Sequence, residues 1–386
     1  MDYDLTPRMI LDRLVGFPTV SRDSNLPLVD FVQDYLAAHG IDSHRIPTPD
    51  GQKAGVIAQV GPNVPGGVVL SAHTDVVPVD GQAWDTDPFT VVETDGRLYG
   101  RGTTDMKGFV AQALHAMVRA KHAPLQRPLQ LALSRDEEIG LLGASDMAQG
   151  LLDHYPKAAA VIVGEPTELQ VVSGHKSCDA LDVHVRGYEV HSSRLFEGVS
   201  AIYVASQLIE WCRAQTVANQ TVPPSPIAAL YDPPFTTLHV GMIHGGTAHN
   251  ITARDCHFTV DVRCVGDDRI DDWVARFRDF ADGLQAQMHA VHADTFIKID
   301  VEPGPGLAPE QDGAAETLVR GITGDNGIRT EAYGTDGGHF QLHGFSTVIC
   351  GPGSIAQAHQ PNEYLAVKDF NAGGAFLDRV IETLGH

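Results

Sequence analysis

Apolar positions along the chain follow two patterns, and the change between them lies near residue 177. Before that point, short apolar runs at 68–71, 129–134 and 158–163 are typical of buried strands. Stretches with apolar residues at helical spacing separate these runs, for example at 106–118. This alternation predicts an α/β domain with a mostly parallel sheet and helices on both faces.

After residue 177 the residues instead alternate between apolar and polar, as in a strand with one buried face. The clearest case is 256–264, where every second residue is apolar and His257, Asp261 and Arg263 share the opposite face. Helical stretches near 198–211 and 270–290 complete the order βαββαβ. We therefore expect an α+β domain whose small sheet is covered on one side by two helices.

Composition limits the classes of partner. The chain has 386 residues, enough for two domains, and 43% of them are hydrophobic. Acidic residues outnumber basic ones 49 to 27, and the net charge of −22 argues against a nucleic-acid or anionic-membrane partner. The first residues lack a secretory signal pattern and no apolar stretch is long enough to span a bilayer, so we expect a cytoplasmic protein. The five scattered cysteines indicate neither a disulfide framework nor a thiolate metal site.

Three consecutive acids, Asp136-Glu137-Glu138, directly follow the apolar run that ends near Arg135. The end of a buried strand places these carboxylates where a sheet meets a crevice, and their mutual repulsion must be offset by positive charge. Arg135 is the only cation near in sequence. A bound metal cation is the natural remaining candidate.

Four further segments supply matching metal ligands: His73-x-Asp75 after an apolar run, Asp105 in a Gly-rich turn, Glu165 just past a strand, and His359. Each is weak alone, since Asp105 could cap a helix, His73 could simply end a strand and Glu165 could lie in a solvated turn. A dinucleotide loop is disfavoured because Asp105 replaces the third glycine and would repel a pyrophosphate. Taken together, the five segments predict a metal site in which Asp75 accepts the far N–H of His73.

The ordered set His73-x-Asp75, Gly100-x-Gly-x-x-Asp105-x-Lys-Gly108, Asp136-Glu-Glu138, Gly164-Glu165-Pro and His359 resembles the M20 family of co-catalytic zinc amidohydrolases and peptidases. The resemblance covers nearly the whole chain. Within the family, residues 332–337 and 351–364 are most similar to the acetylornithine deacetylases.

The resemblance implies a site with two Zn²⁺ ions, for which Co²⁺ is a possible substitute. Asp105 would bridge the ions, with His73 and Glu165 on one and Glu138 and His359 on the other. A mixed histidine and carboxylate shell suits this chemistry. Glu137 would be the general base, taking a proton from water and giving it to the departing amine.

The resemblance also assigns substrate contacts. His191 would donate to the developing oxyanion, in its own or a partner subunit. Asn250 and Arg263 would bind the substrate carboxylate, and Thr335 and Gly353 would contact the substrate backbone. For Arg263 the alternative is a surface pair with Asp261 or another acid.

Ligands before residue 166 and at 359 must meet, so the chain has to return to its first domain. We therefore expect a catalytic domain at 1–177 and 303–386, with 178–302 inserted as a lid and dimerisation domain. The implied activity is hydrolysis of an N-acyl amino acid by a homodimer, with N2-acetyl-L-ornithine to ornithine plus acetate as the leading reaction. A desuccinylase, an aminoacylase, a dipeptidase and a catalytically silent ligand-binding relative are the alternatives.

Overall fold

The structure is a computed structural model that describes residues 3–386, and the chain divides into two compact units. The first unit contains the chain up to Gly174 together with Leu307–Thr330 and Thr335–His386. The second contains His175–Gly306 and Glu331–Gly334. The divisions at 174/175 and 306/307 lie a few residues from the bounds expected from the sequence, and a short segment near residue 332 also belongs to the second unit.

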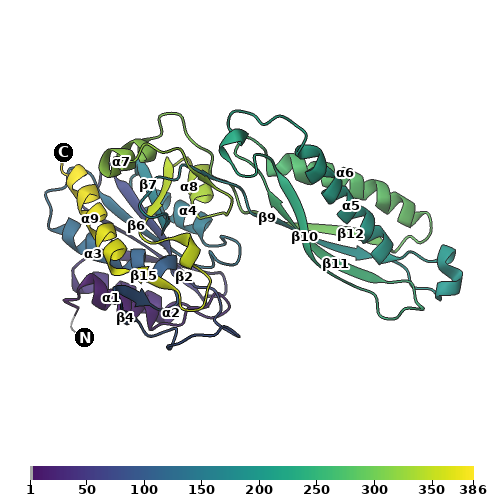
Figure 1. Cartoon of the computed structure of the whole chain (residues 1–386), viewed down its shortest axis with the longest axis horizontal. Coiled ribbons are helices and arrows are strands. Elements are labelled where there is room, and N and C mark those ends of the chain that lie inside the picture. Colours follow the sequence, from purple (N-terminus) through teal and green to yellow (C-terminus); the bar gives the residue numbers. More distant parts are fainter. Residues whose placement is uncertain (1–2) are drawn as a thin grey trace. The chain divides into compact units, whose positions relative to one another are not determined.

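A six-stranded sheet in the order β1-β2-β6-β3-β7-β14 forms the centre of the first unit (Figure 1). Its last four strands run parallel, whereas β1 and β2 are antiparallel to their neighbours, which confirms the mostly parallel sheet. Parallel strands end at the same edge, so the segments after β3, β6 and β7 come together. The strands are β1 (Ser43–Pro47), β2 (Ala54–Val60), β3 (Val68–His73), β6 (Leu129–Ser134), β7 (Ala160–Pro166) and β14 (Thr347–Gly351).

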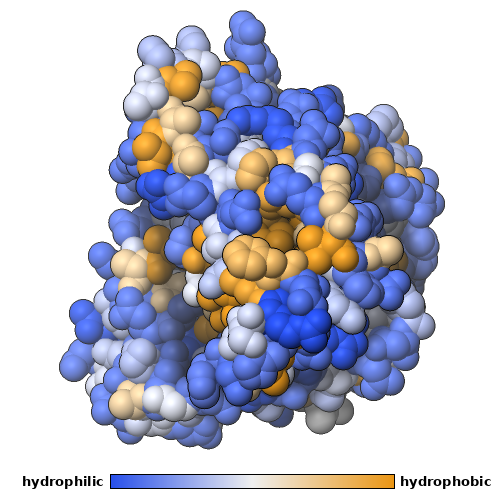
Figure 2. All heavy atoms as spheres, turned by 90° about the vertical axis from the view of Figure 1, so that its right-hand side faces the viewer, coloured by the Kyte–Doolittle hydropathy of each residue, from blue (hydrophilic) through white to orange (hydrophobic). Residues whose placement is uncertain are grey.

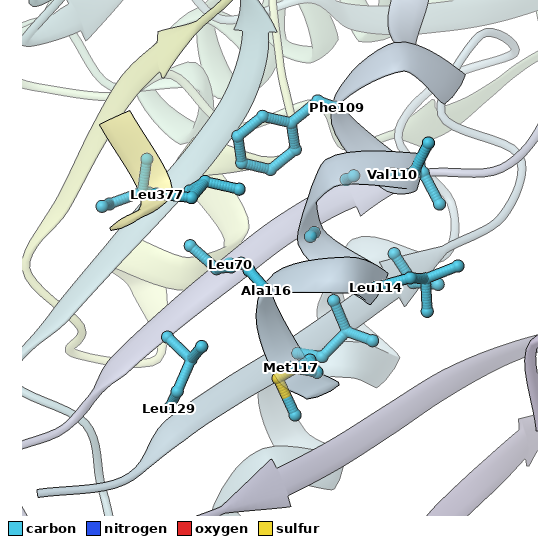
Figure 3. Packing of buried hydrophobic residues seen from close by; sticks show 14 of the residues in the cluster. Leu70, Phe109, Val110, Leu114, Ala116, Met117, Leu129 and Leu377 are labelled. Atoms are coloured by element: carbon cyan, nitrogen blue, oxygen red, sulfur yellow. The ribbon is translucent and has the colours of Figure 1, made fainter. Parts of the chain in front are cut away.

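Helices cover both faces of this sheet, as expected. One core cluster joins helices α1, α2, α3, α7 and α9 to one set of strand side chains, and a second joins α4 and α8 to the alternate set. Figure 3 shows Leu70 of β3 with Phe109 and Met117 of α3 and Leu377 of α9. The helices are α1 (Pro7–Val15), α2 (Leu26–Ala38), α3 (Gly108–Lys121), α4 (Ala144–His154), α7 (Ala314–Thr323), α8 (Gly337–Leu342) and α9 (Val367–Thr383).

Short elements complete the first unit. A three-stranded sheet has the order β15 (Tyr364–Ala366), β5 (Arg97–Tyr99), β4 (Val92–Thr94), with β5 in the middle. The short helical turn η1 (Thr103–Lys107) contains the predicted ligand Asp105, and η4 (Ile355–Gln357) precedes the predicted ligand His359. Asp105 has non-helical backbone angles within η1, three residues before α3 begins, so it lies ahead of the helix instead of starting it.

The second unit is built around a four-stranded antiparallel sheet in the order β10-β11-β9-β12. Its chain order, β9-α5-β10-β11-α6-β12, is the βαββαβ order read from the sequence. The apolar face of β11 packs with both helices, leaving the opposite face of the sheet open. The elements are β9 (Asp179–Arg186), α5 (Ala201–Asn219), β10 (Thr237–Gly245), β11 (Asp255–Arg263), α6 (Ile270–His289) and β12 (Phe296–Glu302).

The remaining short elements lie where the chain passes from one unit to the other or in loops of the second unit. They are β8 (Gly174–His175), β13 (Thr330–Glu331), η2 (Ser192–Glu197) and η3 (Ala228–Leu230). None of the helices within residues 3–386 combines the length and the apolar character needed to cross a membrane.

Candidate metal centre

The five predicted metal ligands of the first unit come together beyond the carboxyl ends of its parallel strands. His73 ends β3, Glu165 lies near the end of β7, and Glu138 follows β6 by four residues. Asp105 comes from η1, and His359 comes from the loop after η4. His359 has a φ of +63°, a conformation that non-glycine residues adopt rarely and that is enriched at functional sites.

Asp105 offers one carboxylate oxygen to each of two ligand groups. Its Oδ1 lies 3.0 Å from His73 Nε2, which is also 3.7 Å from Glu165 Oε1. Its Oδ2 lies 3.3 Å from His359 Nε2, which is 2.9 Å from Glu138 Oε2. The residues therefore form two groups that share Asp105, the arrangement expected of a carboxylate between two metal ions.

The donor set fits divalent metal ions. Desolvation is the largest effect on the pKa values of Glu137 and Glu165 and raises both well above their usual range, and repulsion from neighbouring carboxylates adds to it. Glu138 Oε1 is buried and has no hydrogen-bond partner within residues 3–386. A buried oxygen of this kind is costly unless something binds it, and two imidazoles among carboxylates are good ligands for zinc.

Asp75 has a different contact from the one expected. His73 Nδ1 lies 2.9 Å from the backbone carbonyl of Asp75 and 3.7 Å from its carboxylate, so the carbonyl orients the imidazole. The reason is that β3 ends at His73, and the two side chains no longer share one face of an extended strand. The Asp75 carboxylate instead accepts hydrogen bonds from the backbone N–H groups of Glu137 at 3.2 Å and Glu138 at 3.3 Å, and from Ser21 at 2.6 Å.

The acidic triplet is divided by its backbone. Asp136 has a φ of +55°, so the chain turns there and does not continue as an extended strand. The Asp136 carboxylate forms ion pairs with Lys53 and, at 3.0 Å, with Arg135. Lys53 lies just before β2, and because 83 residues separate it from Asp136, no local sequence pattern could reveal the pair.

Glu363 holds the Asp105 loop, a role that the sequence did not reveal. Its buried carboxylate accepts hydrogen bonds from the backbone N–H groups of Gly102, Thr104 and Asp105 at 2.9–3.1 Å. It also pairs with the buried Arg101 guanidinium at 2.7 Å. The only available sequence signal was its position in the segment 351–364 that carries His359.

Asp336 is a second acid that sequence reasoning passed over, although it follows the predicted substrate residue Thr335 directly. It is buried, accepts a hydrogen bond from Ser134 at the end of β6, and its charge acts on both Glu137 and Glu165. Burial raises the pKa of Asp336 to about 6. Thr335 itself is buried with its hydroxyl accepting from Gly337 N–H at 3.1 Å.

The other predicted substrate residue of the first unit is Gly353. It has a φ of +89°, and its carbonyl accepts a hydrogen bond from Glu168 N–H at 2.7 Å. A Cβ there would lie 2.9 Å from Leu365 and 3.1 Å from Thr104, so the position favours glycine.

Three predicted substrate residues lie in the second unit, at two distant places. His191 and Asn250 are exposed neighbours, because His191 pairs with Ile251 and Asn250 accepts from Ser192 N–H at 2.9 Å. Arg263 ends β11, and its Nε lies 2.9 Å from Asp261, which is the surface pair considered as the alternative. Along β11 the eight steps from residue 255 to 263 span about 26 Å, so Arg263 is remote from the pair formed by His191 and Asn250.

Comparisons with known proteins place the chain in a family. A model of the peptidase family M20/M25/M40 matches residues 69–383. Acetylornithine deacetylase of Myxococcus xanthus is 34% identical over 97% of this chain and 96% of its own length, and that of Pectobacterium carotovorum subsp. carotovorum is 30% identical over 100% of both.

Solved structures show the same fold at lower identity. An M20 family metallo-carboxypeptidase from Sulfolobus solfataricus has a TM-score of 0.77 at 17% identity and covers 100% of both chains. A dinuclear metal binding peptidase of the M20 family from Bacillus subtilis has a TM-score of 0.66 at 15% identity, covering 98% of this chain and 97% of its own. The match of the family model and the identity to full-length relatives show that the chain belongs to peptidase family M20/M25/M40.

Proposed function

We propose that this chain hydrolyses the amide bond of an N-acyl amino acid, with N2-acetyl-L-ornithine as the substrate and ornithine and acetate as the products. The observation that carries the proposal is the pair of ligand groups sharing Asp105, with Glu137 beside them. The choice of acyl amino acid is supported by relatives named acetylornithine deacetylase at 30–34% identity. A desuccinylase, an aminoacylase and a dipeptidase would share the same centre.

The proposed cofactors are two Zn²⁺ ions, replaceable by Co²⁺, held by His73, Glu165, Asp105, Glu138 and His359. When bound, such ions lower the pKa of water and polarise an amide carbonyl. The chain's own part is to fix the ligands. The Asp75 carbonyl orients His73 through Nδ1, leaving Nε2 directed at Asp105 and Glu165.

Glu137 is the proposed proton carrier. Its carboxyl is buried beside His73 and the carboxylates of Glu165 and Glu138, and desolvation raises its pKa well above the usual range. Asp75 holds the backbone N–H of Glu137 and so fixes the turn from which the side chain projects. The Glu137 carboxylate takes a proton from the attacking water and delivers it to the amine nitrogen as the amide bond breaks.

Substrate contacts are proposed for residues of both units. Arg263 binds the substrate carboxylate with its planar guanidinium, and Asn250 contributes to the same recognition. Thr335 and Gly353 contact the substrate backbone, and His191 donates to the developing oxyanion.

The spacing of these residues supports a homodimer formed through the second unit. An N-acyl amino acid is much shorter than the span of about 26 Å between the two ends of β11, so Arg263 and the pair of His191 and Asn250 of one chain cannot contact one substrate molecule. A second copy can supply His191 and Asn250 to that site. We therefore propose that each active site takes Arg263 and His191 from different chains of the dimer.

The surface of the second unit supports the same assembly. β10 is an edge strand of the sheet, and edge strands can pair with another chain. Large apolar side chains are exposed there, and Figure 2 shows apolar residues gathered on the face turned to the viewer. The large apolar side chains exposed in the second unit include Phe196 of η2, Tyr203 of α5, Met242 and Ile243 of β10, and Ile251.

Acetate release from N2-acetyl-L-ornithine in the presence of Zn²⁺ tests the function. Glu137→Gln should lower kcat by about 10²–10⁴-fold with metal content unchanged. Glu382→Gln, on the exposed face of α9, is the matched control and should keep full activity. Equal rates in Glu137→Gln and wild type would contradict the mechanism, and a higher kcat/KM for N-succinyl amino acids would favour a desuccinylase.

A further inference from the structure

A row of histidines crosses the open face of the sheet in the second unit. The strand register pairs His244 of β10 with His257 of β11, and His257 with His184 of β9. Directly paired residues project from the same face of a sheet, with Cβ atoms about 4.5–5.5 Å apart. The three side chains line one open depression of about 360 Å³ on the side away from α5 and α6.

Asp255 adds a carboxylate to this row. It lies two residues before His257 on β11, so both side chains project from the same face. Its Oδ1 is 2.8 Å from His184 Nε2, and the rings of His184 and His257 are stacked at 4.0 Å. One ligand atom from each of these three residues can be chosen so that all lie within 4.8 Å of one another.

We propose that His184, His257 and Asp255 form a second metal site, separate from the metal centre of the first unit, for a divalent transition metal such as Zn²⁺. Ligand atoms around tetrahedral zinc lie about 3.3 Å apart, given zinc–nitrogen bonds of about 2.0–2.1 Å. The present spacing is within reach of that value through rotation of these side chains, of which His257 is exposed and His184 and Asp255 are half-buried. Two imidazoles and one carboxylate suit zinc, copper and nickel, and His244 is placed to supply a fourth ligand.

Neighbouring charged side chains influence the affinity of this site for a metal ion. Arg186 Nε lies 2.6 Å from Asp255 Oδ1 and competes with a cation for that oxygen. Lys298, paired with His184 in the register, directs its ammonium to Asp300. A bound ion therefore either displaces Arg186 or uses Asp255 Oδ2, and the affinity is lower than in a buried cluster.

An ion here would cross-link β9 and β11 through side chains of two strands. Because only the folded sheet brings the three ligands together, binding stabilises the second unit. The site lies wholly in the second unit, so this inference does not rest on the proposed function.

Isothermal titration of Zn²⁺ into the full-length, zinc-loaded enzyme tests the site. Wild type should bind one more Zn²⁺ per chain than His257→Gln, in which this uptake should be absent or weakened at least about tenfold. His184→Gln should behave in the same way. His239→Gln is the control, since His239 is exposed on β10, pairs with Asp261 and lies four residues, about 13 Å, along the sheet from the row.

The result that overturns the proposal is equal Zn²⁺ uptake in wild type and His257→Gln. Equal loss of uptake in His239→Gln would overturn it too, because the ion would then bind exposed histidines without a defined site. His257 is exposed, so its variant should fold, and melting of each variant without added metal verifies this. The difference in zinc count between wild type and variant is independent of how many ions the first unit holds and of any catalytic activity.

Discussion

Glu363→Gln is expected to loosen the loop that carries Asp105, because the carboxylate is the common acceptor of four hydrogen bonds. Three come from backbone N–H groups of that loop and one from Arg101, at 2.7–3.1 Å. In the variant an NH₂ group replaces one of the two oxygens. The N–H groups that donated hydrogen bonds to the replaced oxygen then face the NH₂ group, which is itself a donor.

The magnitude follows from burial. Side chains of Arg101 and Glu363 are each 1% exposed, and breaking a buried ion pair costs about 3–5 kcal/mol. Each unsatisfied backbone donor costs about 1–3 kcal/mol, but these terms overlap with the first because they involve the same carboxylate. We expect the free energy of unfolding to fall by about 3–5 kcal/mol in total.

A matched control removes the same charge at the surface. Glu93 pairs with Arg8 at 2.6 Å, with side chains 53% and 30% exposed, so Glu93→Gln should cost at most about 1 kcal/mol. Urea unfolding of both variants gives the comparison, and zinc content per chain shows whether Asp105 still binds. Similar losses of stability in the two variants, or full zinc content with unchanged stability in Glu363→Gln, would refute the reasoning.

Three further predictions concern the first unit. Leu70→Ala should lower the free energy of unfolding by about 2–5 kcal/mol in urea, because the fully buried Leu70 packs in the core cluster with α3 and α9 and its loss leaves a cavity. Burial opposes ionisation of Asp325, but hydrogen bonds from backbone N–H groups and Arg329 lower its pKa to about 2. The stability it contributes is therefore present above the unfolded pKa of about 3.9 and lost as pH falls through about 2, and the stability difference between wild type and Asp325→Asn should shrink from pH 5 to pH 2. Removal of metal with a chelator should abolish activity and lower the melting temperature, because buried carboxylates such as Glu165 lose their cations, and an unchanged melting temperature in differential scanning fluorimetry would contradict this.

The sequence predicted features that depend on local pattern and chain order. Apolar runs at 68–71 and 129–134 predicted buried strands, and β3 and β6 are both fully buried. Alternation at 256–264 placed five apolar residues on one face, and all five lie in the core of the second unit. Acids and histidines near the ends of such strands were predicted to lie together, and they do so because parallel strands end at one edge of a sheet.

What the sequence could not reveal are contacts between distant segments. Lys53 meets Asp136, and Glu363 meets the Asp105 loop, through the tertiary fold alone. An extended chain predicted that the Asp75 carboxylate would contact His73. Because the strand ends at His73, the Asp75 backbone carbonyl makes this contact instead.

Contacts between distant segments explain why the adjacent acids Glu137 and Glu138 take different positions. Glu137 and Glu138 are adjacent in the sequence, and in an extended chain their side chains would point to opposite sides. That pattern alone does not indicate which of the two approaches His359. The positive φ of Asp136 turns the chain, and the ion pair with Lys53 holds that turn from β2. Asp75 then binds both following N–H groups, so that Glu138 lies 2.9 Å from His359. The turn held by the pairing of Asp136 therefore brings Glu138, the proposed ligand, to His359 and leaves Glu137 as the proposed proton carrier.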